Sequence, residues 1–250
     1  MKNILFHFLL ITSLYCIHID REEDLQKCIA LADKSAFSAV GWVSTSKKYC
    51  TGTLIHPRVV LTSAYTVKDC EDLSFNIDLF GKYFCIRGKA ILHPTYLTIK
   101  KDETLTVEEI ASEIALIILD EPLYGVNYLK LPLREVSVEK SMHVIGYGEW
   151  KNQTPTYVRA SKLGCNLYID SKNDHLMRAP YLNDKDLSLF GYPAAGDMGC
   201  PLISKDGNYT LQGIYRNYYK EGENSYSLFI DLFPHLDWIE NTIKQSLKDH

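Results

Sequence analysis

Short apolar and β-branched runs, separated by turn residues, cover most of the chain from Phe37 onward. In the first half they fall at residues 39–43, 51–55, 58–62, 75–80, 83–86, 90–92 and 114–119, and in the second half at 142–148, 201–203 and 210–215. Many short strands with irregular connections are typical of an all-β barrel or sandwich. The pattern therefore predicts an all-β protein.

Only the C-terminal end shows a clear helical period. Trp238, Ile239, Thr242 and Ile243 would share one face of a helix, which we expect over residues 235–247. A break near 126–140 separates two β-rich halves, about 37–125 and about 140–234. Residues 95–112 predict a charged loop. Residues 19–35 are polar and acidic at first, which predicts an arm and not a strand.

The N-terminus predicts a secretory signal peptide over residues 1–18. Lys2 supplies one positive charge, and the run from residue 4 to 16 is apolar and short. A membrane anchor is the alternative, but it needs about 20 apolar residues. Cleavage is expected between Cys16 and Asp20. The remaining domain, 19–250, is therefore expected to be secreted and extracellular.

Composition narrows the classes of partner and cofactor. The 250 residues carry a net charge of -4 and show no basic stripe, so neither nucleic acid nor a membrane surface is expected as a partner. No Cys-x-x-Cys spacing occurs, so neither a metal nor another cofactor is expected. Asn152 and Asn208 each begin a glycosylation sequon. We expect a monomer.

The chain contains seven cysteines, and six remain once Cys16 is removed with the leader. A secreted protein can oxidise them to disulfides. Six cysteines allow fifteen pairings, and the sequence alone does not choose among them.

Seven short motifs occur in the order found in chymotrypsin/trypsin-like serine proteases. They are Cys-Thr-Gly-Thr-Leu-Ile (50–55), Val-Leu-Thr-Ser-Ala-Tyr (60–65), Ser-Glu-Ile-Ala-Leu-Ile (112–117), Val-Ile-Gly-Tyr-Gly (144–148), Gly-Asp-Met-Gly-Cys-Pro (196–201), Leu-Gln-Gly-Ile (211–214) and Asp-Trp-Ile (237–239). The chain resembles this family over roughly residues 37–245. The resemblance implies two six-stranded antiparallel β-barrels, followed by the C-terminal helix, with an active-site cleft between the barrels.

By this resemblance, the catalytic His, Asp and Ser positions fall at Tyr65, Glu113 and Met198. The triad needs a nucleophile, a base that takes its proton and a carboxylate that orients the base. A phenol with a pKa near ~10 is a poor base at neutral pH. A thioether has no proton to lose and cannot form an acyl-enzyme. The degenerate triad predicts that the protein is not an enzyme.

The resemblance also assigns the surroundings of the triad. Gly196 and Met198 would supply the backbone amides of the oxyanion hole. Tyr192, Arg216 and Tyr218 fall at the floor and wall of the primary specificity pocket and are expected to block it. A filled pocket cannot supply binding energy to a transition state.

Asp197 matches the aspartate that pairs with a new N-terminal amine in the activated family members. The chain has no Arg/Lys-Ile-Val-Gly-Gly activation site. We therefore expect Asp197 either to lie near solvent or to find another donor, since a buried unpartnered carboxylate is costly.

The resemblance further implies the disulfides Cys28–Cys165 and Cys50–Cys70. Cys85 and Cys200 remain. For Cys200 a buried free thiol is favoured over a bond to Cys85.

The leading interpretation is a secreted pseudoprotease that acts by protein binding. It is similar to inactive arthropod homologues, namely the clip-less haemolymph and venom homologues and the inactivated paralogues of the scabies mite. This resemblance implies extracellular protein partners, either cascade proteases or their substrates. Exposed tyrosines around the cleft, at 215, 218, 219 and 226, are candidates for the binding surface. The alternatives are a weak or rearranged serine-type endopeptidase and a small-ligand carrier that uses the remodelled cleft.

Overall fold

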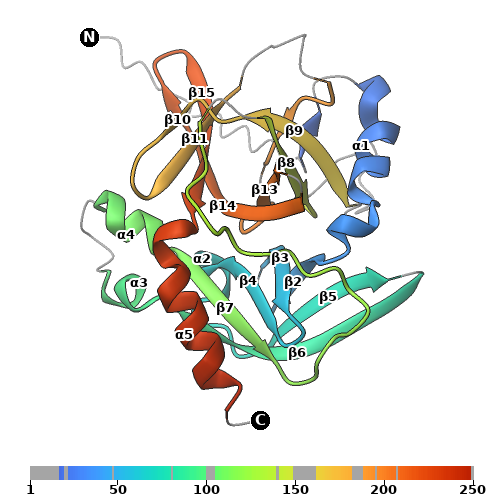
Figure 1. The fold of residues 1–250 in the computed structure, drawn as a ribbon, viewed down its shortest axis with the longest axis vertical. Helices are drawn as coiled ribbons and strands as arrows, with labels where there is room; N and C mark the ends of the chain where they lie inside the picture. Colours follow the sequence, from blue (N-terminus) through green and yellow to red (C-terminus); the bar gives the residue numbers. More distant parts are fainter. Residues whose placement is uncertain are drawn as a thin grey trace, which may run out of the picture.

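The computed structural model describes residues 17–19, 22–46, 48–79, 81–99, 105–138, 141–148, 162–181, 188–194, 196–206 and 208–248. Two β-rich halves lie one above the other, and the C-terminal helix runs along the side of the lower half (Figure 1). The all-β class with a C-terminal helix is therefore confirmed. Residues 1–16 of the expected signal peptide and the sequon residue Asn152 lie outside the described residues.

The first half is a closed six-stranded barrel in the order β2-β3-β4-β7-β6-β5. Its strands are β2 (Val40–Thr45), β3 (Tyr49–His56), β4 (Val59–Ser63), β5 (Leu73–Leu79), β6 (Lys82–Leu92) and β7 (Ile114–Leu119). β4 and β7 are buried along their whole length, because their β-branched and aliphatic residues fill both faces. Gly41 and Gly52 face each other across β2 and β3, and a Cβ on Gly41 would lie 2.4 Å from the Asn76 carbonyl oxygen.

The second half is one antiparallel sheet in the order β10-β11-β15-β14-β13-β8-β9. Its strands are β8 (Ser141–Gly146), β9 (Leu163–Tyr168), β10 (Ser171–Lys172), β11 (Leu176–Pro180), β13 (Pro201–Asp206), β14 (Asn208–Glu221) and β15 (Asn224–Asp231). Six strands were expected here, and two-residue β10 is the additional one. A separate pair joins β1 (His18–Ile19) to β12 (Gly191–Tyr192).

The helices are short except at the C-terminus. They are α1 (Leu25–Ala32), α2 (Ala64–Val67), α3 (Pro94–Thr98), α4 (Val107–Ala111) and α5 (Leu236–Ser246), with 3-10 turns η1 (Glu22–Asp24), η2 (Ser35–Phe37) and η3 (Phe233–His235). Within the described part of the chain, no helix is long and apolar enough to cross a membrane.

The arm expected over residues 19–35 contains a helix, α1, that was not predicted from the sequence. Cys28, Leu31 and Ala32 are buried on one side of the helix, at the spacing that a helical face requires. This face packs on β9, where a Cβ on Gly164 would lie 3.1 Å from the Leu31 side chain. The sequence contains this apolar spacing over only the 8 residues of α1. The polar residues before it therefore dominated the prediction for the segment.

Helix α4 likewise replaces part of the expected charged loop. Thr106 caps it, because the Thr106 hydroxyl accepts a hydrogen bond from the Glu109 amide while the Glu109 carboxylate accepts one from the Thr106 amide. The capping box therefore gives this charged segment a defined structure beside the junction of the two halves.

Candidate active site at the junction of the barrels

A buried carboxylate from the first barrel meets a cation from the second half. Glu113, directly before β7, is 5% exposed, and its Oε2 lies 3.2 Å from Nε of Arg216 on β14. The Ser63 hydroxyl donates to Oε1 of Glu113 at 3.1 Å. Burial raises the pKa of Glu113, and the charge of Arg216 opposes that rise. The expected orienting carboxylate is thus engaged by an arginine and a serine.

Tyr65 lies in the first turn of α2, immediately after Ser63 and Ala64. Its side chain is 51% exposed, and the Lys48 ammonium lies 3.9 Å from the centre of its ring. This distance is a cation–π contact. The Ala64 amide donates to the Glu113 carbonyl at 3.2 Å, which ties the backbone of α2 to the start of β7. The site therefore presents an aromatic ring to solvent beside the buried ion pair.

The loop of Met198 is clamped between the two halves. The Thr51 amide of β3 donates to the Met198 carbonyl at 3.0 Å, and the Gly199 amide donates to the Tyr215 carbonyl at 2.8 Å. Gly196 and Gly199 have φ values of 89° and 80°, in the region that favours glycine. A Cβ on Gly199 would lie 2.5 Å from the Thr51 carbonyl oxygen. The glycines thus allow this loop to lie directly on the first barrel.

Asp197 is completely buried and accepts three backbone hydrogen bonds. The Gly148 amide donates to Oδ1 at 2.8 Å and the Ala194 amide to Oδ2 at 3.0 Å, and the third donor is the amide of Ile17. Burial raises the pKa of Asp197 to about 7 against these hydrogen bonds. Of the two expectations for Asp197, burial rules out a place near solvent, and the amides supply the other donors.

The three residues expected to block the specificity pocket have different environments. Tyr192 stacks on Tyr181 with ring centres 3.7 Å apart, Arg216 turns to Glu113, and Tyr218 is 59% exposed. Tyr181 was not found from the sequence, because nothing near it in the chain points to Tyr192. Burial raises the pKa of Tyr181 to about 12. Two stacked phenol rings therefore occupy the space beside β12.

A cleft of about 570 Å³ lies beside Arg216. Ile110 of α4 contributes one wall, and the second half contributes Arg216, Asn217, Tyr219 and Leu228. Its volume is within the range of small-molecule and peptide-side-chain sites. The described residues contain no group of three or more His, Cys, Asp or Glu side chains arranged to hold a metal ion.

The six described cysteines are free thiols in the structure, so it joins neither Cys28 to Cys165 nor Cys50 to Cys70. The two cysteines of each expected pair nevertheless interact. Burial is the main cause of the raised pKa values of Cys165 and Cys50, and Cys28 and Cys70, respectively, raise them further. Cys85 is exposed and Cys200 is buried. Asn208, the described sequon, is exposed at the start of β14.

Comparison with known proteins defines the class. The family model described as Trypsin matches residues 32–239, which is most of the chain. The chain therefore belongs to the trypsin family of serine proteases, in agreement with the barrel, the second sheet and the C-terminal helix.

Among characterised relatives, the chain is similar to Kallikrein-1E2 of the horse, Equus caballus. The two are 24% identical over 219 residues, covering 79% of this chain and 81% of the kallikrein.

The comparisons correct the expectation that the protein is not an enzyme. Both the family match and the kallikrein relative point to a serine protease. The sequence-based argument rested on the side chains at 65, 113 and 198, which describe one site, whereas the family match extends over both halves of the fold.

Proposed function

We propose that this trypsin-family protein is secreted and acts by binding other extracellular proteins, either proteases of a proteolytic cascade or their substrates. The binding face we propose includes Tyr65 and Tyr218. Tyr215 and Tyr226, expected to be exposed there, are instead buried in the second half. The observation that carries this proposal is their exposure, 51% and 59%, beside a Glu113 carboxylate that Arg216 and Ser63 already engage. Tyrosine supplies large, rigid contact area and is enriched at protein interfaces.

Secretion rests on the leader-like N-terminus and on the position of Ile17. The described chain begins with Ile17 buried against Asp197, one residue beyond the apolar leader. Leader removal between Cys16 and Ile17 would leave this buried contact intact. Sequencing the N-terminus of protein recovered from the medium of secreting cells tests this step. We expect Ile17 as the first residue, and a start after residue 20 would contradict it.

Binding is tested by quantitative capture from the extracellular fluid of the source tissue. The secreted chain is compared with the double variant Tyr65→Ala/Tyr218→Ala and with the control Tyr124→Ala. Tyr124 is also exposed, and it belongs to the segment that joins β7 to β8, outside the residues of the proposed face. We expect the wild type and the control to capture the same protein in equal amounts. The double variant should capture at least about tenfold less of it, as for the loss of interface hot spots. Equal capture by all three would contradict the proposed face.

The second candidate is a serine-type endopeptidase activity, which the family match and the kallikrein relative favour. The clamped loop with Gly196 and Gly199 retains the glycines that its backbone geometry requires. Peptide-ester hydrolysis by the same preparations separates the two candidates. Hydrolysis that is faster than in buffer alone, and equally fast with Tyr65→Ala/Tyr218→Ala, supports endopeptidase activity. Capture of a protein without any hydrolysis supports the binding function.

A further inference from the structure

Three histidines from three parts of the chain meet where both halves contact the C-terminal helix. His93 follows β6 and precedes α3, His175 lies between β10 and β11, and His235 ends η3 and precedes α5. The ring centres of His93 and His235 are 5.1 Å apart, and those of His175 and His235 are 6.4 Å apart. We call these three residues the histidine cluster.

Each ring of the histidine cluster has a buried nitrogen without a hydrogen-bond partner. These atoms are Nδ1 of His93, Nδ1 of His175 and Nε2 of His235. His235 lies between the other two rings and is 7% exposed. A neutral imidazole tolerates this setting, whereas an imidazolium would be a buried charge without a paired acceptor. The packing therefore selects the neutral form.

The surroundings supply little compensating charge. The Trp238 ring of α5 lies 4.9 Å from that of His93, and Glu108 of α4 is the carboxylate whose charge acts on His93. Burial lowers the pKa of His93 despite Glu108. Burial, followed by the charges of the other two rings, lowers the pKa of His235 to about 4.

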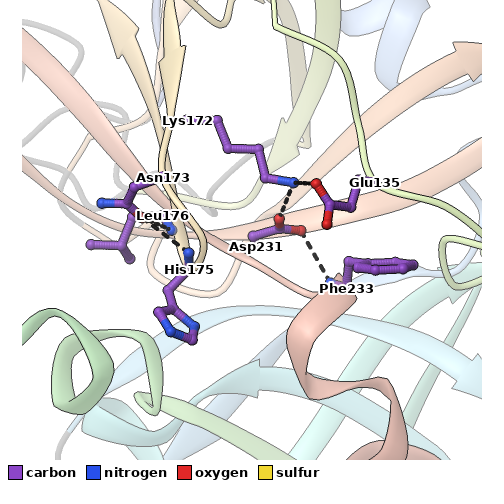
Figure 2. Close-up of polar contacts among 7 residues, drawn as sticks. All are labelled: Glu135, Lys172, Asn173, His175, Leu176, Asp231 and Phe233. Carbon is purple, nitrogen blue, oxygen red and sulfur yellow. Dashed lines mark hydrogen bonds and ion pairs between the residues drawn. The ribbon is translucent and has the colours of Figure 1, made fainter.

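The carboxylates on the side of the second half are already engaged (Figure 2). The Lys172 ammonium lies 2.7 Å from Oδ2 of Asp231 and 3.3 Å from Oε2 of Glu135. The Asp231 amide donates to the His175 carbonyl at 2.9 Å, while the His175 ring points away from this ion pair. Because Lys172 neutralises Asp231, this carboxylate does not supply a free negative charge to the histidine cluster, and Asp174, next to His175 in the chain, is exposed to solvent.

We propose that the histidine cluster is an acid-sensitive latch, which holds α5 against both halves at neutral pH and releases it when the surrounding medium becomes acidic. When His93 and His235 are protonated, each proton binds an unpartnered ring nitrogen, and the two charges repel each other across 5.1 Å. Moving α5 away lets water solvate both of these rings. Release would occur in an acidic extracellular or endosomal setting and goes beyond the proposed binding function.

The sign of the effect follows from the lowered pKa. Well above pH 6.5 the rings of His93 and His235 are neutral in both the closed and the open state, so the latch is closed. As the pH falls from about 6.5 to about 4, His235 is protonated in the open state but not in the closed state, so the equilibrium shifts toward opening. For His235 alone, opening becomes about 30-fold more favourable between pH 7.5 and pH 5.0.

Amide hydrogen exchange of the whole secreted chain tests the latch. Protection of residues 236–246 is measured at pH 7.5 and 5.0, corrected for intrinsic rates, with β7 as the internal reference. We expect the protection of α5 to fall about 30-fold while β7 remains protected, and the fall to shrink below about fivefold in His235→Gln. His56→Gln, a histidine outside the cluster, should behave as the wild type.

A second variant and a second measurement cover the case in which His235→Gln does not fold. His93→Gln removes one neighbour and should reduce the fall only in part. In the NMR titration of the wild type, the His235 imidazole should titrate well below 6.5, together with the loss of α5 protection. Unchanged protection at pH 5.0, or an equal fall in His235→Gln, would overturn the latch.

Discussion

At the residue scale, the ion pair between Glu113 and Arg216 distinguishes this site. Both side chains are largely buried, at 7% and 16% exposure, and the two come from different halves of the fold. Arg216, together with the Ser63 hydroxyl, thus offsets part of the desolvation of a carboxylate that the family resemblance would assign to a catalytic role. Whatever the site binds, it does so beside a charge pair that is already formed.

Removing the arginine should be costly, because it leaves an uncompensated buried carboxylate. We expect Arg216→Leu to lower the free energy of unfolding by about 3–5 kcal/mol at pH 8. The loss should be smaller at pH 5, because burial raises the pKa of Glu113 and, without the charge of Arg216 to oppose that rise, the carboxyl takes up a proton more readily as the pH falls. Adding Glu113→Leu should restore part of the stability. Urea unfolding at both pH values measures these differences.

Arg178→Leu is the matched control for this experiment. Arg178 also pairs with a carboxylate, Asp170, at 3.0 Å, but both side chains are more exposed, at 30% and 27%. We expect a loss of about 1 kcal/mol from this partly exposed pair. An Arg216→Leu variant no less stable than Arg178→Leu would show that the buried pair adds nothing beyond a surface contact.

At the element scale, α1 attaches the N-terminal segment to the second half. Its buried face, with Cys28, packs on β9, which carries Cys165. The helix is only two turns long, and helices of this length depend on tertiary packing for their stability. A covalent link between α1 and β9 would therefore stabilise the packing of this short helix.

We expect the secreted chain to contain Cys28–Cys165 and Cys50–Cys70. The first bond closes a long loop and should contribute about 4 kcal/mol, or about 10 °C in melting temperature. Mass spectrometry of non-reduced peptides identifies the bonds, and Cys28→Ala should lower the melting temperature by that amount. Cys85→Ala, at an exposed cysteine outside both pairs, should have no such effect. Alkylation of all six thiols without reduction would contradict the pairing.

At the scale of the whole molecule, Ile17 connects the start of the described chain to the site. Ile17 is buried with its amide on Asp197, and β1 continues from it to pair with β12. Asp197 in turn precedes Met198 in the loop between the halves. A change at Ile17 therefore acts directly on the loop of the candidate site through Asp197.

A chain that begins at Ile17 should be more stable than one that carries an extra glycine before it. Cleavage converts the Ile17 amide to an ammonium, which would lower the pKa of Asp197 from its value of about 7. In the extended chain, stability is lost as pH rises from about 4 to about 7, because the unfolded carboxyl ionises first. We expect a difference of about 2–4 kcal/mol at pH 7 by urea unfolding.

Asp197→Asn is the control, because it removes the charge from the pair. The two chain lengths should then be equally stable at pH 7. If the glycine extension leaves the wild-type stability unchanged, Ile17 does not place its amine on Asp197.

Much of the fold follows from local sequence. The β-branched runs at 58–62 and 114–119 predict strands because alternation and branching depend only on close neighbours, and Trp238 with Ile239 predicts α5 for the same reason. The Gly-Asp-Met-Gly motif likewise locates the loop of Met198. The sequence alone thus determines the strands, the terminal helix and the position of this loop.

The contacts that give the site its chemistry required the tertiary structure. Arg216 reaches Glu113 across the two halves, whereas Tyr181 stacks on Tyr192 and Ile17 lies on Asp197 through the packing of the second half. The histidine cluster joins three segments that are far apart in the chain. No local pattern encodes these pairs, since burial and the charge that faces a buried group depend on which distant segments pack together.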